Sequence, residues 1–145
     1  MKFNFITMKG LVIKTTGTLC KVLSDENLIF DCKIKGKTRL QKIDFTNPIA
    51  VGDYVDFQFN KKNNIGFIEH IHKRKNYIIR KSVNLSHRSQ LIASNIDLAL
   101  LIITIDNPVT SLNFIDRFLV QSAAYGIELK LVFNKIDLIN KSTNN

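Results

Sequence analysis

Four consecutive residues near the end of the chain have the types and the order that could select a guanine base. Asn134-Lys135-Ile136-Asp137 follows a predicted strand at 128–133 and has the pattern Asn-Lys-x-Asp. A carboxylate at Asp137 can accept hydrogen bonds from the ring N–H and the exocyclic amine of guanine. Adenine offers neither donor at that edge and would leave the carboxylate unpaired, at a cost of about 1–3 kcal/mol. The stem of Lys135 can lie along the base plane, Asn134 is suited to tying this loop to a phosphate-binding loop, and Ile136 needs only to fit. We therefore predict that these four residues bind GTP or GDP, the alternative being a polar turn that caps a strand.

The segments before this motif predict a βαβ unit with parallel strands. Ile96–Ile103 is a nearly continuous apolar run, which is typical of a strand buried on both faces. Ser111–Tyr125 has helical spacing and ends at Gly126. Glu128–Phe133 is the second predicted strand, so the motif lies beyond a carboxyl end, where open parallel sheets bind ligands. The helix is expected to bury one apolar face, made of Leu112, Ile115, Leu119 and Ala123.

The chain has no phosphate-binding loop of the form Gly-x-x-x-x-Gly-Lys-Ser/Thr, which GTP hydrolysis also requires. Its one Gly-Lys-Thr, at Gly36-Lys37-Thr38, has Asp31 where the first glycine is needed, and we interpret it as a basic hairpin loop. The sequence also lacks the Asp-x-x-Gly of a magnesium-side switch. If the guanine motif is real, the phosphate loop must follow it. The GTPase domain is then circularly permuted, and we expect no catalytic residue in this chain.

The first half of the chain reads as short strands joined by turns, and about five strands at this spacing fit an OB-fold barrel. We therefore predict an all-β OB-fold barrel followed by the start of a circularly permuted, P-loop GTPase-like α/β domain. Residues 1–9 form an N-terminal extension, 10–80 the OB-fold domain, and 81–145 the N-terminal part of the GTPase domain, truncated before the phosphate loop. The expected barrel strands are Leu11–Ile13, Thr18–Leu23, Asn27–Lys33, Val51–Phe59 and Ile65–Ile71.

The excess of positive charge lies in the first part of the chain. Residues 1–90 carry 17 Lys and Arg against 7 Asp and Glu, a balance of +10, whereas residues 91–145 carry 4 against 5, a balance of −1. This asymmetry indicates a polyanionic partner for the barrel, the alternative being a solvated basic surface with no partner. Tyr54 and Tyr77 could stack on bases, although packing is the plainer role for both. The candidate RNA contacts are Lys33, Lys35, Lys37, Arg39, Lys61, Lys62, Lys73, Arg74, Lys75, Arg80 and Lys81.

Metal, disulfide and membrane roles are not indicated. Cys20 and Cys32 lack metal-ligand spacing and are expected on neighbouring strands as small core residues. His70 and His72 alternate on one predicted strand but would need further ligands, so we predict no metal site. The longest apolar run, residues 96–105, is too short to span a bilayer. Because no signal peptide is evident either, we expect a cytoplasmic monomer with no membrane partner.

Several of these segments, taken in order, resemble a known family. Val51–Val55 in the barrel is followed by Ser94–Leu98, Phe114–Leu119 and Asn134–Leu138, an order similar to the ribosome small-subunit-dependent GTPase A family. The resemblance implies a GTP-binding and GTP-hydrolysing factor that acts late in assembly of the bacterial small ribosomal subunit and binds its ribosomal RNA. It also implies Mg²⁺ and Zn²⁺ in later domains that this sequence does not contain. The chain is then the N-terminal portion, which would be inactive in hydrolysis by itself.

Two other functions fit the same residues. The first is a non-catalytic OB-fold RNA-binding protein whose βα segment no longer binds nucleotide. The second is another permuted GTPase with a different RNA target. Guanine-nucleotide affinity separates the leading hypothesis from the first, and binding to the ribosomal subunit separates it from the second.

Overall fold

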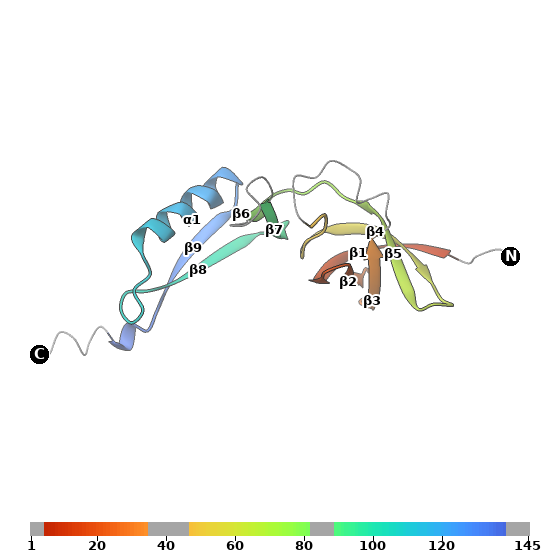
Figure 1. Cartoon of the computed structure of the whole chain (residues 1–145), viewed down its shortest axis with the longest axis horizontal. Coiled ribbons are helices and arrows are strands. Elements are labelled where there is room, and N and C mark those ends of the chain that lie inside the picture. The colour runs from red at the N-terminus through yellow and green to blue at the C-terminus, as the bar shows by residue number, and fades with distance from the viewer. Residues whose placement is uncertain (1–4, 35–46, 82–88, 139–145) are drawn as a thin grey trace, which may run out of the picture. The chain divides into compact units, whose positions relative to one another are not determined.

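The computed structural model describes residues 5–34, 47–81 and 89–138 (Figure 1). Contacts divide the chain into two units, residues 1–95 and 96–145. The elements of the first unit are β1 (Phe5–Thr16), β2 (Leu19–Ser24), β3 (Ile29–Ile34), β4 (Tyr54–Asn60), β5 (Ile65–Ile71), β6 (Tyr77–Lys81) and β7 (Ser89–Ser94). Those of the second unit are β8 (Leu98–Thr104), α1 (Leu112–Ala124) and β9 (Glu128–Asn134).

Strands β1 to β5 close into a barrel in the order β1-β2-β3-β5-β4 (Figure 1). All neighbours are antiparallel except β3 and β5, whose parallel pairing closes the ring. The first strand is longer than the three residues expected, because its first half pairs with β4 and its second half with β2. Alternate residues along β2 and β4 point inward and pack the core. That core comprises Val12, Cys20, Val22, Cys32, Ile49, Val55, Phe57 and Ile68.

The antiparallel hairpin β6–β7 was missed by the sequence analysis, which placed a boundary between residues 80 and 81. It is joined to the barrel through the turn 51–53: the Ser94 amide donates to the Val51 carbonyl at 2.9 Å, and Val51 bridges Ala93. At Gly52, with φ of 93°, an added Cβ would collide with the Ser94 carbonyl oxygen. Asn47 also binds β7, because its side-chain amide donates to the Leu91 carbonyl and accepts from the Leu91 amide. These contacts carry the first unit through to Asn95.

In the second unit, β8 and β9 run parallel in register from Leu98↔Glu128 to Thr104↔Asn134, with α1 between them in sequence. The predicted βαβ order is confirmed, but burial of β8 on both faces is not. Its burial alternates: Leu101 and Ile103 are buried, whereas 58% of Leu100 and 62% of Ile102 is exposed. Within the described residues, only one face of this two-stranded sheet is covered.

The predicted apolar face of α1 is correct only at Ile115. The shielded positions are Ile115, Phe118, Gln121 and Ser122, whereas Leu112, Leu119 and Ala123 are exposed. Apolar side chains surround much of this helix, so their spacing did not single out the covered side. Its ends agree better with the sequence. The Ser111 hydroxyl accepts a hydrogen bond from the Phe114 amide, and Gly126 follows the last turn with φ of 65°.

Candidate functional site

The guanine motif lies at one edge of the β8–β9 sheet, where two loops meet. Because Thr104 and Asn134 are register partners at the carboxyl ends of parallel strands, loop 105–110 and segment 135–138, which is helical from residue 136, leave the sheet at the same edge. The sequence analysis predicted this placement for the motif. Such an edge is where open α/β sheets bind ligands.

Lys135 links these two loops. Its backbone is left-handed, with φ of 58°, and its amide donates to Asn134 Oδ1 at 3.0 Å. The Lys135 carbonyl then accepts from the Leu138 amide at 3.1 Å, which closes a turn. Its Nζ donates to the Asn107 carbonyl at 2.8 Å. Lys135 is therefore held at both ends, with its aliphatic stem between them.

The loop that receives Lys135 is itself cross-linked at its base. The Thr110 amide donates to the Thr104 carbonyl at 2.8 Å, and the Thr104 amide donates to Thr110 Oγ1 at 2.9 Å. The Thr104 hydroxyl also bonds the Pro108 carbonyl. Asn107 has φ of 43°, an αL conformation that Asn tolerates better than most residues. Sequence reasoning missed Asn107.

Asp137, the residue assigned to guanine recognition, is exposed. No other residue in the described part of the chain bonds its carboxylate, so the group is available to accept hydrogen bonds. Ile136 is 59% exposed and leaves the loop without burying itself. The geometry is thus compatible with the predicted guanine contact.

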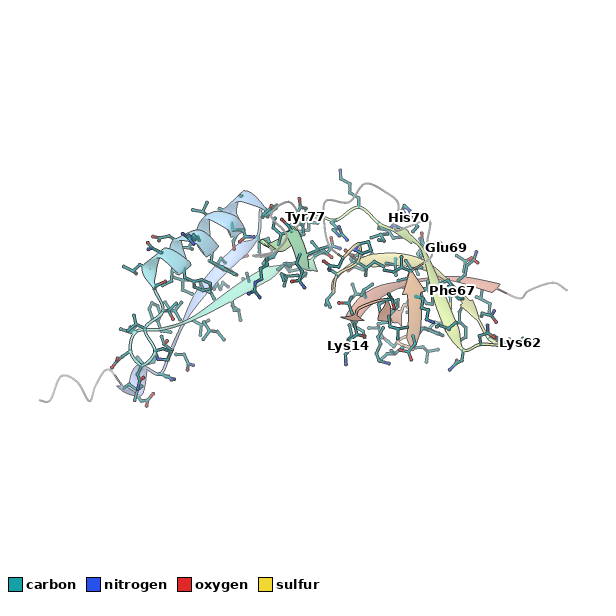
Figure 2. The ribbon with its side chains drawn as sticks, in the orientation of Figure 1. Lys14, Lys62, Phe67, Glu69, His70 and Tyr77 are labelled. Atoms are coloured by element: carbon teal, nitrogen blue, oxygen red, sulfur yellow. The ribbon has the colours of Figure 1, made fainter. Side chains whose placement is uncertain are left out.

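The candidate RNA-binding cations are spread over the first unit. Lys33 is exposed on β3, Lys61 and Lys62 on the β4–β5 turn, and Lys73, Lys75 and Arg80 beyond β5. Figure 2 shows Lys62 at the turn end of the β4–β5 hairpin. The backbone of Lys81 pairs with Ser89 at the end of β6. Three candidates, Lys35, Lys37 and Arg39, lie outside the described residues.

The side chain of Arg74 is held within the fold. Its Nε and Nη2 donate to the Asp53 carboxylate at 2.7 and 2.8 Å, and Nη2 also donates to the Pro48 carbonyl at 2.9 Å. Asp53 is fully buried, and it also accepts from Ser94 Oγ and the Ala50 amide. We assign Arg74 to this network, and its RNA contact stays a prediction.

Two further cations lie beside Lys33 on the outer surface of the barrel. Lys14 and Lys21 are register partners on β1 and β2, and Lys21 pairs with Asp31 of β3 at 2.8 Å. Lys14 is exposed, and Figure 2 shows it projecting from the barrel. The strand alternation could have identified these two residues, because the core positions Cys20 and Val22 flank Lys21.

Aromatic and imidazole side chains occupy the same unit. Tyr54 is 55% exposed, whereas Tyr77 on β6 is half-buried. His72 Nε2 lies 3.0 Å from Asp56 Oδ1, and the rings of His70 and His72 are 5.2 Å apart. No group of three metal-ligating side chains occurs among the described residues. The helical segments in that part of the chain include none with the length and apolar composition needed to cross a bilayer.

Cys20 and Cys32 are buried register partners on β2 and β3 and form no disulfide, although the Cys20 thiol donates to the Cys32 carbonyl at 3.4 Å. Burial raises the pKa of the Cys20 thiol to about 11 and that of Cys32 to about 12. Since the thiolate is the reactive form, these are inert core residues, as the sequence indicated.

Comparison with known proteins shows which family combines these features. Residues 9–68 match the model of the RsgA N-terminal domain, and residues 71–145 match that of the RsgA GTPase. The chain is 55% identical over 137 residues to a small ribosomal subunit biogenesis GTPase RsgA from Flavobacterium psychrophilum, covering 93% of this chain and 42% of that protein. It is 50% identical over 134 residues to an RsgA from Bacteroides thetaiotaomicron, covering 92% and 43%. The chain thus spans less than half the length of these relatives.

Two solved structures share the fold. YjeQ from Thermotoga maritima has a TM-score of 0.67 at 28% identity, over 95% of this chain and 46% of that one. YloQ, described as a circularly permuted GTPase, has a TM-score of 0.65 at 27% identity, over 95% and 45%. The predicted fold class, an OB-fold barrel followed by the start of a permuted GTPase domain, is confirmed. With both of its units matched in order, the chain belongs to the RsgA GTPase family.

Proposed function

We propose that this chain supplies the RNA-docking and guanine-selecting parts of a GTPase that acts in assembly of the small ribosomal subunit. The observation that carries the guanine half is the cross-linked loop pair, in which Lys135 is held between Asn134 and Asn107 beside the available carboxylate of Asp137. These groups lie where a base would enter an open parallel sheet. GTP and GDP are the ligands, bound through Asn134, Lys135, Ile136 and Asp137.

The RNA half rests on charge and exposure in the barrel. Exposed lysines lie on the outer surface of β1 and β3 and on the β4–β5 turn, within a segment that carries a balance of +10. OB-folds bind nucleic acids through such surfaces, and phosphate contacts give an affinity that falls as salt is added. The partner we propose is the ribosomal RNA of the small subunit, bound by a monomer in the cytoplasm.

Catalysis is assigned to segments other than this one. The sequence contains no phosphate loop, so phosphate binding, Mg²⁺ binding and positioning of water require residues outside it. The same holds for Zn²⁺. The domain limits we propose remain 1–9, 10–80 and 81–145, although contacts group residues 81–95 with the barrel.

Two measurements test this proposal. The first is sedimentation of the chain with purified small subunits at a series of salt concentrations. The logarithm of the affinity should fall linearly with the logarithm of the salt concentration. Reading the coding DNA beyond Asn145 should show a Gly-x-x-x-x-Gly-Lys-Ser/Thr and then an Asp-x-x-Gly. A chain that binds unstructured RNA and small subunits equally well, with no phosphate loop downstream, would instead be the non-catalytic RNA-binding protein.

A further inference from the structure

The two ends of the barrel are closed to different degrees. Near the β1–β2 turn, the segment before β4 packs Ile49, 3% exposed, against the barrel and leaves a cavity of only about 10 Å³. Near the β2–β3 and β4–β5 turns the cavity is about 550 Å³. We call this second cavity the barrel mouth; its volume falls in the range of small-ligand sites.

The floor of the barrel mouth is apolar. Phe30 and Phe59 lie edge to face, with ring centroids 4.7 Å apart, and both pack on the core together with Met8. Ile6 and Leu28 line the same cavity and remain 43% and 52% exposed. An apolar group entering the cavity would remove these two side chains from water, which is favourable.

The rim of the mouth carries charges of both signs. Lys9 and Lys61 line it together with Asp25 and Glu26. None of these four side chains makes a hydrogen bond or ion pair with another residue in the described part of the chain, although opposite charges line one cavity. Each is therefore available to a ligand.

The mouth continues along β1 into a second cavity of about 240 Å³, which shares Lys9 and Asp25 with it and is also lined by Tyr54 and His72. A ligand filling both cavities is extended. Nucleic acid is disfavoured as that ligand, because two carboxylates at the rim offset the two lysines, in a unit that is otherwise strongly basic. An extended peptide can place an apolar side chain in the mouth, with charges on either side.

We propose that the barrel mouth binds a peptide segment of a protein partner, with one large apolar side chain between Phe30, Phe59 and Leu28. An acidic residue of the peptide pairs with Lys9 and Lys61, and a basic residue pairs with Asp25 and Glu26. This inference is independent of the proposed GTP contact, since the mouth contains no residue of the guanine motif. It shares one residue, Lys61, with the candidate RNA contacts, and the RNA control below separates the two roles.

The test is a two-dimensional NMR titration of the 145-residue chain with a blocked pentapeptide, Lys-Gly-Phe-Gly-Glu. Its controls are the same peptide with Ala for Phe, and octa-uridylate RNA. The Phe peptide should shift the amides of Ile6, Lys9 and Leu28, and the Ala peptide should bind at least about tenfold more weakly. Absence of shifts with the Phe peptide at millimolar concentration overturns the proposal. Shifts of the mouth amides by RNA alone would place the mouth on an RNA surface instead.

Matched variants separate the mouth from the rest of the barrel. Leu28→Asp should abolish peptide binding, whereas Ile29→Asp should leave it unchanged, because Ile29 is similarly exposed but does not line the cavity. The double variant Lys9→Glu with Lys61→Glu should bind the Phe peptide more weakly. A peptide with Lys in place of its Glu should restore the affinity of this variant. Equal affinities for Leu28→Asp and Ile29→Asp, or no response to the charge reversal, would overturn the assignment.

Discussion

The guanidinium of Arg74 donates two hydrogen bonds, of 2.7 and 2.8 Å, to the Asp53 carboxylate, which has no exposed surface. The same carboxylate accepts a hydrogen bond of 2.5 Å from the Ser94 hydroxyl. The turn before β4, the segment after β5 and the end of β7 are thus joined through one buried anion.

Removing either charge of this pair should destabilise the first unit strongly. Arg74→Ala or Asp53→Ala leaves a buried charge without its partner, which costs about 3–5 kcal/mol. Urea unfolding followed by circular dichroism measures the loss. Lys73→Ala is the control, because Lys73 is exposed on the neighbouring position and should change the free energy of unfolding by less than about 0.5 kcal/mol. Equal effects of the Arg74 and Lys73 variants would contradict the role given to the network.

Asp137→Asn should exchange guanine for xanthine selectivity in the protein that contains the phosphate loop. An amide can donate to the extra xanthine carbonyl, whereas it lacks the charge that accepts the two guanine donors, so GTP affinity should fall by at least about tenfold. Competition between GTP and xanthosine triphosphate measures this. Asp106→Asn, on the neighbouring loop, is the control and should leave the preference unchanged. Unaltered GTP affinity in Asp137→Asn would remove the guanine assignment.

Charge reversal at Lys35, Lys37 and Arg39 should weaken binding to the small subunit and make it less sensitive to salt. Each lost phosphate contact lowers the slope of log affinity against log salt by about 0.7–0.9. Sedimentation with subunits at several salt concentrations provides the slope. Charge reversal at Lys14 and Lys33 gives the corresponding slope for the outer surface of β1 and β3, for comparison with the slope for segment 35–39. If reversing the charges of one group of residues leaves the salt slope of subunit binding unchanged, that group does not contact phosphate.

Alkaline pH should destabilise the barrel through its cysteines. The folded-state pKa values, about 11 for Cys20 and about 12 for Cys32, lie above the ordinary value of 9.0. Below pH 9 both thiols are protonated in the folded and in the unfolded state, so the thiols do not lower the free energy of unfolding. As pH rises above 9 the unfolded state releases protons first, so the free energy of unfolding falls until the folded pKa values are reached.

Unfolding midpoints measured between pH 8 and about pH 11 check this prediction about the thiols. The double variant Cys20→Ala with Cys32→Ala has a lower midpoint because of the lost volume, but its decline above pH 9 should be shallower. A decline as steep as that of the unaltered chain would assign the pH dependence to other groups.

Local patterns in the sequence predicted the features that depend on neighbouring residues. The barrel strands followed from alternation, as at Val55, Phe57 and Phe59, and the guanine motif is a run of four residues after a strand. Partners distant in sequence could not be read in this way. Asn107 lies 28 residues from Lys135, and Asp53 lies 21 residues from Arg74. Arg74 was therefore grouped with its basic neighbours as a candidate RNA contact.

The missed hairpin and the misplaced helix face have a different cause. Strands β6 and β7 are five and six residues long, and Arg80 and Lys81 end the first of them, so neither gives a clear alternation. In α1, Phe114, Leu119 and Val120 are apolar but exposed. Spacing alone cannot decide which side of such a helix meets the sheet, because the answer depends on the neighbouring strands.

The hydrogen bond from Lys135 to the Asn107 carbonyl also has a thermodynamic consequence. A base that lies along the lysine stem contacts a side chain whose ammonium is held by loop 105–110. The affinity for the base and the conformational equilibrium of that loop are then reciprocally linked, because both depend on the position of the same side chain. A molecule that binds the β8–α1 loop would therefore change the affinity for the nucleotide without contacting the nucleotide.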